Sequence, residues 1–123
     1  MRRRKIMART WRALVDAGWY CKESLTPLYD IMAYKDGFKV LVKCMKSLSQ
    51  ITDAARFLLC GRAVQEAEDA KKRNVKYRDV YAFFAVFTDY GLFLIDALNL
   101  KRIKPIELEV YLRNQRSIRP FEL

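Results

Sequence analysis

The stretch "LYDIMAYKDGFKVLVKCMKS", residues 28–47, decides the fold. Two runs of alternating and β-branched residues, 29–34 and 38–46, flank Asp36-Gly37, and an Asp-Gly pair between such runs is a strong signal for a β-hairpin. The second run is almost continuously apolar from Val40 to Val42, as expected for a central strand buried on both faces. The stretch therefore predicts a hairpin whose second arm lies inside a larger sheet.

The segments around this hairpin predict helices on both sides of it and further strands. The expected elements are, in chain order, a helix over 6–17, a strand over 19–24, the hairpin, a helix over 49–74 with a bend or break at Gly61, strands over 80–88 and 91–98, and a helix over 106–114. Ile106, Val110 and Leu112 are expected to dock the last helix, and 115–123 is expected to be an irregular tail. The order α-β-β-β-α-β-β-α predicts an α/β protein with one mixed sheet of about five strands flanked by helices.

Length and composition limit the class of protein. A chain of 123 residues that is 52% hydrophobic suits a single domain spanning 1–123. Cys21, Cys44 and Cys60 show no C-x-x-C spacing, so neither a disulfide framework nor a zinc site is predicted, and a reducing compartment is expected. Because apolar runs are far shorter than the roughly 20 residues that cross a bilayer, we expect a soluble intracellular protein, cytoplasmic or nucleoid-associated, with no membrane partner.

Charge is the first indication of function. The chain has 24 Lys and Arg against 14 Asp and Glu, a net charge of +10, and it contains no His. This balance favours a polyanionic partner, most often nucleic acid, over an ordinary basic surface. Without His, the Ser-His and Cys-His forms of catalysis are excluded, so carboxylates and lysines would have to carry any chemistry.

Several basic residues are expected to bind nucleic acid. They are Arg2, Arg3, Arg4, Lys5, Arg9, Lys43, Lys71, Lys72 and Arg73. Residues 1–5 are expected to form a mobile basic arm that neutralises phosphates without reading bases, with a merely disordered terminus as the alternative. Tyr29, Tyr34 and Phe38 are suited to stacking on bases, although packing between strands is the simpler explanation for aromatic residues in a hairpin.

The element order, with Asp30 opening the second strand and Lys46 on the third, resembles the archaeal Holliday junction resolvases, a branch of the restriction-endonuclease-like (PD-(D/E)xK) superfamily. "ARTWRALVDAGWYCKES" (8–24) resembles the opening helix and first strand of that branch, the hairpin its metal-binding hairpin, and "FFAVFTDYGLFLIDAL" (83–98) its closing strand pair. The resemblance implies a restriction-endonuclease-like domain, a homodimer, branched or duplex DNA as partner, and Mg²⁺ as the cofactor of an endonuclease.

The residues of the implied active site depart from the family pattern. In the family, an Asp of the second strand and an acid two positions before the Lys of the third strand hold the metal, because hard carboxylates bind Mg²⁺ and alternate strand residues face the same way. Asp30 and Lys46 match the outer positions, but Cys44, a soft ligand, stands at the middle one. The acid of the first helix aligns with Met7 or Arg9. The resemblance thus implies a degenerate site with Asp30 as a weak metal ligand, and Cys44 is expected to be a small buried residue.

Three functions stay open. The first is a catalytically impaired relative that binds nucleic acid, most simply DNA, in an accessory or architectural role that needs no cofactor. The second is a Mg²⁺-dependent, structure-selective endonuclease in which Glu23 replaces the missing acid beside Asp30 and Lys46. A solvated Glu23 and an Asp30–Lys46 ion pair are the non-catalytic explanations of these residues. The third is an assembly subunit whose basic patches bind an acidic protein or RNA.

Overall fold

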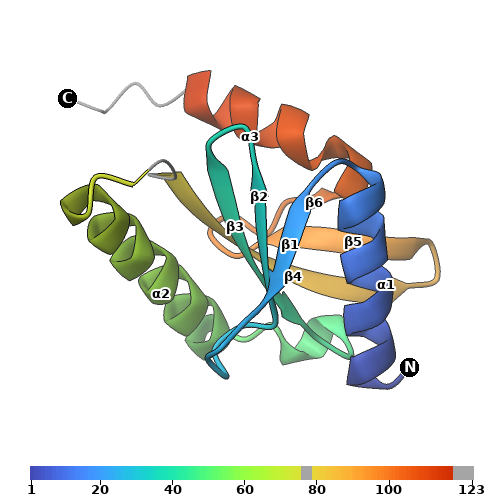
Figure 1. Cartoon of the computed structure of the whole chain (residues 1–123). Helices are drawn as coiled ribbons and strands as arrows, with labels where there is room; N and C mark the ends of the chain where they lie inside the picture. Colours follow the sequence, from blue (N-terminus) through green and yellow to red (C-terminus); the bar gives the residue numbers. More distant parts are fainter. Residues whose placement is uncertain (76–78, 118–123) are drawn as a thin grey trace.

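The computed structural model describes residues 1–75 and 79–117. Its elements are α1 (Arg3–Asp16), β1 (Tyr20–Glu23), β2 (Ile31–Lys35), β3 (Phe38–Cys44), η1 (Leu48–Gln50), α2 (Asp53–Lys72), β4 (Asp79–Thr88), β5 (Gly91–Asp96), β6 (Arg102–Ile103), η2 (Pro105–Glu107) and α3 (Leu108–Ser117). Figure 1 shows their arrangement. Within these ranges, no helix is both long enough and apolar enough to span a bilayer.

One mixed sheet runs through the described part of the chain, in the order β1-β2-β3-β4-β5-β6. β3 and β4 pair in parallel and are joined by α2, because parallel neighbours require a long crossover connection, while the other neighbouring pairs are antiparallel. The prediction of an α/β protein with a mixed sheet and flanking helices is confirmed. The sheet has one more strand than expected, since β6 is only two residues long and too short to show a periodic pattern.

The hairpin that decides the fold is formed as predicted. β2 and β3 pair from Ile31↔Val42 to Lys35↔Phe38, which leaves Asp36 and Gly37 as a two-residue loop. Both loop residues have positive φ, 48° and 85°, as a type I′ turn requires. The local sequence is therefore sufficient to set this register.

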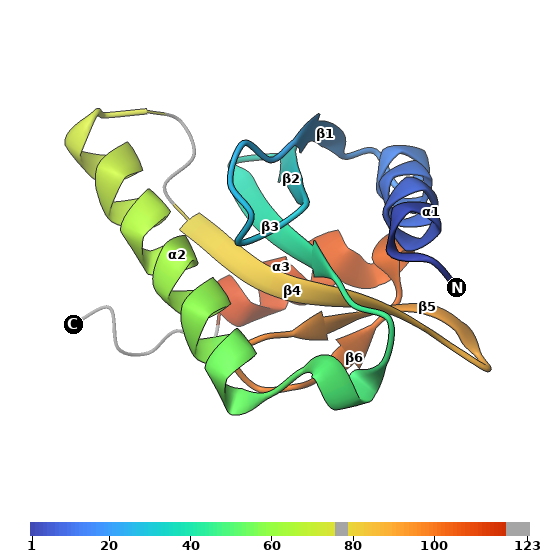
Figure 2. The same cartoon turned by 90° about the horizontal axis from the view of Figure 1, so that it is seen from below.

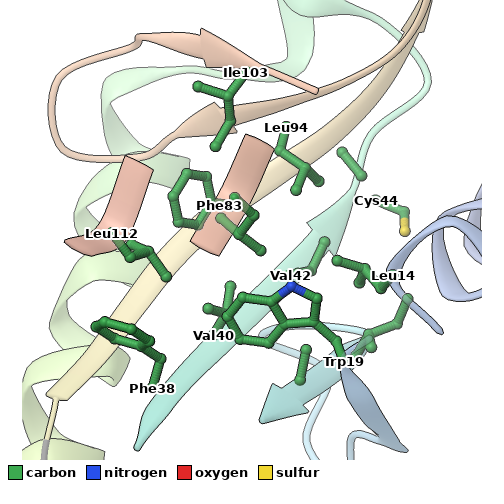
Figure 3. Packing of buried hydrophobic residues seen from close by; sticks show 14 of the residues in the cluster. Leu14, Trp19, Phe38, Val40, Val42, Cys44, Phe83, Leu94, Ile103 and Leu112 are labelled. Carbon is green, nitrogen blue, oxygen red and sulfur yellow. The ribbon is translucent and has the colours of Figure 1, made fainter. Parts of the chain in front are cut away.

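Helices cover both faces of the sheet (Figure 2). α1 and α3 pack on one face, where Leu14 and Leu112 contact a core of sheet residues that includes Val40 and Phe83 (Figure 3). α2 packs on the other face, where its Leu59 belongs to a second core. Phe84 lies in this second core, so the adjacent Phe83 and Phe84 point to opposite faces, as expected of consecutive residues on a strand.

The first helix begins earlier than predicted. α1 starts at Arg3, and the amide of Ile6 donates to the carbonyl of Arg2, so the predicted mobile arm over 1–5 is wrong for Arg3, Arg4 and Lys5. The run of cations did not indicate a helix start, because cations are unfavourable at the positive end of a helix dipole. Tertiary contacts on the buried face of α1 outweigh that local preference.

Two other helices also differ from expectation. α2 is continuous through Gly61, so the predicted break there is wrong, and it begins after Thr52, whose hydroxyl accepts from the Ala55 amide at 3.1 Å. Of the residues expected to dock the last helix, Leu112 packs against the sheet, but Ile106, which lies in η2, and Val110 are 71% and 61% exposed. Residues 115–117 continue α3, and the rest of the predicted tail, 118–123, lies outside the described residues.

Candidate functional site

Asp30 lies immediately before β2, and both of its carboxylate oxygens have partners. Oδ1 forms an ion pair with Nη2 of Arg3 on α1, and Oδ2 accepts a 2.7 Å hydrogen bond from the backbone amide of Cys44. The side chain of Asp30 is 11% exposed and that of Arg3 is 48% exposed. The cation beside Asp30 is therefore a guanidinium of the chain itself, and the predicted Asp30–Lys46 pair is wrong.

Cys44 is a small buried residue, as predicted. Its side chain belongs to the α1-side core and is 1% exposed. Burial, and next the negative charge of Asp30, raise the pKa of the Cys44 thiol to about 12, so the thiol is protonated at neutral pH. Met7 is partly buried and packs against the same core.

Among the described residues, neither Lys46 nor Glu23 bonds to the side chain of Asp30. β3 ends at Cys44, so Lys46 lies beyond the strand, where it is exposed and its amide donates to Oε1 of Gln50 at 2.8 Å. The prediction that Lys46 and residue 44 lie on the same face of one strand is therefore wrong, because Lys46 is not part of β3. Glu23 is the exposed last residue of β1.

These residues do not fit a magnesium ion. Arg3 and the Cys44 amide engage the two oxygens of Asp30, and a protonated thiol is a poor ligand for a hard cation. Within residues 1–75 and 79–117, no three Cys, Asp or Glu side chains gather closely enough to hold a metal. Glu23 pairs with Ile31 across β1 and β2, next to Asp30, but it does not form a group of three such ligands with Asp30 and Cys44.

Basic side chains gather on the solvent side of α1. Lys5, Arg9 and Arg12 recur at i, i+4 and i+7, which places them on one side of the helix, and all three are exposed. Arg9 also lies over the ring of Phe87, with its guanidinium carbon 5.6 Å from the centroid. We call the exposed set Arg2, Arg4, Lys5, Arg9 and Arg12 the α1 basic face. Arg12 is absent from the sequence prediction, although its helical spacing from Lys5 would have found it.

The other predicted nucleic-acid residues lie elsewhere. Lys71, Lys72 and Arg73 are exposed at the C-terminal end of α2, at the end of the molecule away from the start of α1 (Figure 1). Cations at a helix C-terminus are favoured by the dipole, which explains them without a ligand. Lys43 points to the α2 side, opposite Cys44 as predicted, and its Nζ donates to the carbonyl of Pro27 at 3.0 Å. The structure therefore does not unite the predicted residues into one surface.

A buried charge cluster on α2 has no counterpart in the sequence prediction. Glu66 is 9% exposed, accepts from Tyr29 Oη at 2.8 Å and from Arg62 Nε at 2.7 Å, and lies 2.6 Å from Lys39 Nζ. Burial alone would raise the pKa of Glu66, but hydrogen bonds from Lys39, Tyr29 and Arg62 outweigh it and hold the pKa below its ordinary value. Burial and the bond to Glu66 raise the pKa of Tyr29 to about 12.

The aromatic residues of the hairpin divide between core and surface. Tyr29 and Phe38 are 4% and 0% exposed, so neither is available to stack on bases. Tyr34 is half-buried on the α2 side of the sheet. Packing is thus the correct explanation for Tyr29 and Phe38, and stacking stays open for Tyr34.

No protein-family model matches this chain, and no curated protein matches its sequence.

Proposed function

We propose that this protein binds nucleic acid, most simply DNA, through the α1 basic face and does not cleave it. In this proposal it is a catalytically inactive relative of the archaeal Holliday junction resolvases with an accessory or architectural role. The observation that carries the proposal is the engagement of Asp30 by Arg3 and by the Cys44 amide. An internal cation and a protonated thiol stand where the metal and its second carboxylate would be required.

The charge distribution supports the binding half of the proposal. The first turn of α1 reads "RRKI", so three cations lie at the positive end of the helix dipole, each disfavoured there by about 0.3–1 kcal/mol. Backbone amides at a helix N-terminus and nearby cations both attract phosphate. A bound phosphate backbone would relieve this local repulsion. Phosphate binding therefore accounts for three cations at a position that the helix dipole disfavours.

The homodimer implied by the resemblance is part of the proposal. Phe57, Leu58 and Val64 are 79%, 57% and 58% exposed on the outer side of α2, and Gly61 lies between them on the helix. A second copy of α2 would cover this apolar stripe, and an assembly role would use it in the same way. Sedimentation of the purified chain tests the dimer, and a single monomeric species would count against it.

Incubation of the protein with labelled four-way junction, duplex and RNA, in Mg²⁺ or Mn²⁺, tests the proposed function. We expect salt-sensitive binding without cleavage, because the residues around Asp30 do not fit a metal. An Asp30→Ala variant is the control. Cleavage by the native protein that is lost in this variant would favour the endonuclease, in which Glu23 takes the place of the missing acid. Failure to bind any nucleic acid at low salt would favour the assembly role.

A triple variant, Lys5→Gln, Arg9→Gln and Arg12→Gln, tests which surface binds. We expect weaker duplex binding. The slope of the logarithm of the binding constant against the logarithm of salt concentration should fall in magnitude by up to about 3, since each phosphate contact contributes about 0.9 to it. The matched control is Lys101→Gln, Arg102→Gln and Lys104→Gln, which removes the same charge from exposed positions near β6. Equal losses in both variants would show that only net charge matters.

A further inference from the structure

A row of residues crosses the three N-terminal strands on the α2 side of the sheet. Tyr20 on β1 pairs with Tyr34 on β2, which pairs with Lys39 on β3. The two tyrosine rings lie 6.4 Å apart, and Lys39 Nζ lies 5.6 Å from the centroid of the Tyr34 ring. Lys22 Nζ lies 5.9 Å from the Tyr20 centroid. Tyr20 is 63% exposed, so its ring is available to a ligand.

Two adjoining cavities run along this row. The first, about 360 Å³, is lined by Tyr20, Lys22 and Tyr34, and it shares Lys39 with the second, about 440 Å³, which continues to Arg62. We call the two together the tyrosine groove. α2 packs on β3 and β4, and its Ala70 lines both cavities, so among the described residues the groove lies between the C-terminal part of α2 and the outer strands β1 and β2.

Two of the cations in the groove are held in place by a carboxylate. Glu66 at its floor binds Lys39 at 2.6 Å and Arg62 at 2.7 Å, so neither side chain must be ordered when a ligand arrives. Among the described lining residues, the cations are Lys22, Lys39, Arg62 and Arg73, and the anions are Glu66 and Asp69. The groove therefore has a positive excess beside the exposed ring of Tyr20.

We infer that the tyrosine groove binds an unpaired strand of nucleic acid, with a base stacked on Tyr20 and the backbone along Lys22, Lys39 and Arg62. Stacking rings beside a positive groove are the means by which proteins hold single strands, and a base inside a duplex cannot reach such a ring. The inference rests on the proposed function in one respect, that the ligand is a nucleic acid. Its surface is separate, because α1 lies on the opposite face of the sheet.

Tyr20→Leu tests the inference, since it keeps an apolar side chain on an edge strand and removes the stacking ring. Affinity for a labelled oligonucleotide of eight thymidines is measured by fluorescence anisotropy, with the uridine oligoribonucleotide of equal length as a second arm to distinguish DNA from RNA. We expect at least about fivefold weaker binding. The matched control is Tyr90→Leu, which removes an 85% exposed ring from the β4–β5 turn and should bind as the native protein does. Equal binding by the native protein and Tyr20→Leu, or equal losses in both variants, would overturn the inference.

A second variant, Tyr20→Trp, reports stacking directly. Its added fluorescence should be quenched by the thymidine oligonucleotide, and an unquenched indole would contradict a stacked base. Polyglutamate that displaces the oligonucleotide at equal concentration would point instead to an acidic peptide and would also overturn the inference.

The two nucleic-acid proposals fail in different ways. The α1 triple variant should lose duplex binding and keep oligonucleotide binding, whereas Tyr20→Leu should do the reverse. A native protein that binds duplex but not the oligonucleotide would refute the groove alone, and one that binds the oligonucleotide but not duplex would refute the role of α1 alone.

Discussion

Glu66→Ala is expected to lower the free energy of unfolding by about 3–5 kcal/mol, the range found when one partner of a buried ion pair is removed. The carboxylate holds Tyr29, Lys39 and Arg62 within 2.6–2.8 Å, and α2 meets the hairpin there. Its loss leaves the largely buried Lys39 ammonium, 18% exposed, without its counter-ion. The penalty comes from this uncompensated charge more than from the contacts themselves.

Urea unfolding measures this effect. Glu68→Ala is the matched control, because Glu68 is exposed on the same helix and its removal should change stability by no more than about 0.5 kcal/mol. If Glu66→Ala lowers the free energy of unfolding by less than about 1 kcal/mol, the interactions of Glu66 in the folded protein stabilise it little more than hydration of the same groups does.

The same carboxylate should make stability depend on pH. The folded pKa of Glu66 lies below its ordinary value near 4.5, so the unfolded chain binds the proton more tightly. The contribution of the Glu66 carboxylate to stability is therefore complete above its unfolded pKa, and it is lost as the pH falls through its folded pKa. Native protein should lose more stability than Glu66→Gln when the pH is lowered below 4.5.

Joint replacement of Cys44 by Glu and of Arg3 by Ala is expected to create binding of Mn²⁺ at millimolar concentration. The change sets a second carboxylate beside Asp30 and removes the guanidinium that occupies the cation position. Titration calorimetry and a metal-dependent rise in melting temperature measure the gain, because a ligand that binds the folded state stabilises it.

Single variants separate the two causes. Cys44→Glu alone keeps the competing Arg3, and Arg3→Ala alone keeps the thiol, so both should bind metal more weakly than the double variant. Because Cys44 is 1% exposed, a shorter Cys44→Asp replacement guards against failure to fold. A folded double variant that shows no response to metal would mean that the hairpin is not a retained metal-binding scaffold.

The elements that follow local rules were predictable. The hairpin depends on two loop residues with positive φ, and Phe83 and Phe84 must face opposite sides of any strand. The last helix shows where such rules stop. Ile106 with Val110 and Leu108 with Leu112 both form apolar i, i+4 pairs, and only the position of the sheet selects Leu108 and Leu112, both 0% exposed, as the buried pair.

The candidate site was predictable only in part. The soft Cys44 within the hairpin is visible in the sequence, and so is the excess of positive charge. The sequence did not reveal that Arg3 belongs to a helix and neutralises Asp30, or that Glu66 is buried under Lys39 and Arg62.

The sequence by itself therefore determined the order of the helices and strands apart from the short strand β6, the hairpin register and the absence of a hard ligand at residue 44. The tertiary structure decided which charges meet. Arg3 and Asp30 are 27 residues apart, and Tyr29 and Glu66 are 37 residues apart. Backbone torsions and side-chain periodicity act over a few residues, whereas such distant pairs form only when helices settle on the two faces of the sheet and water leaves the space between them.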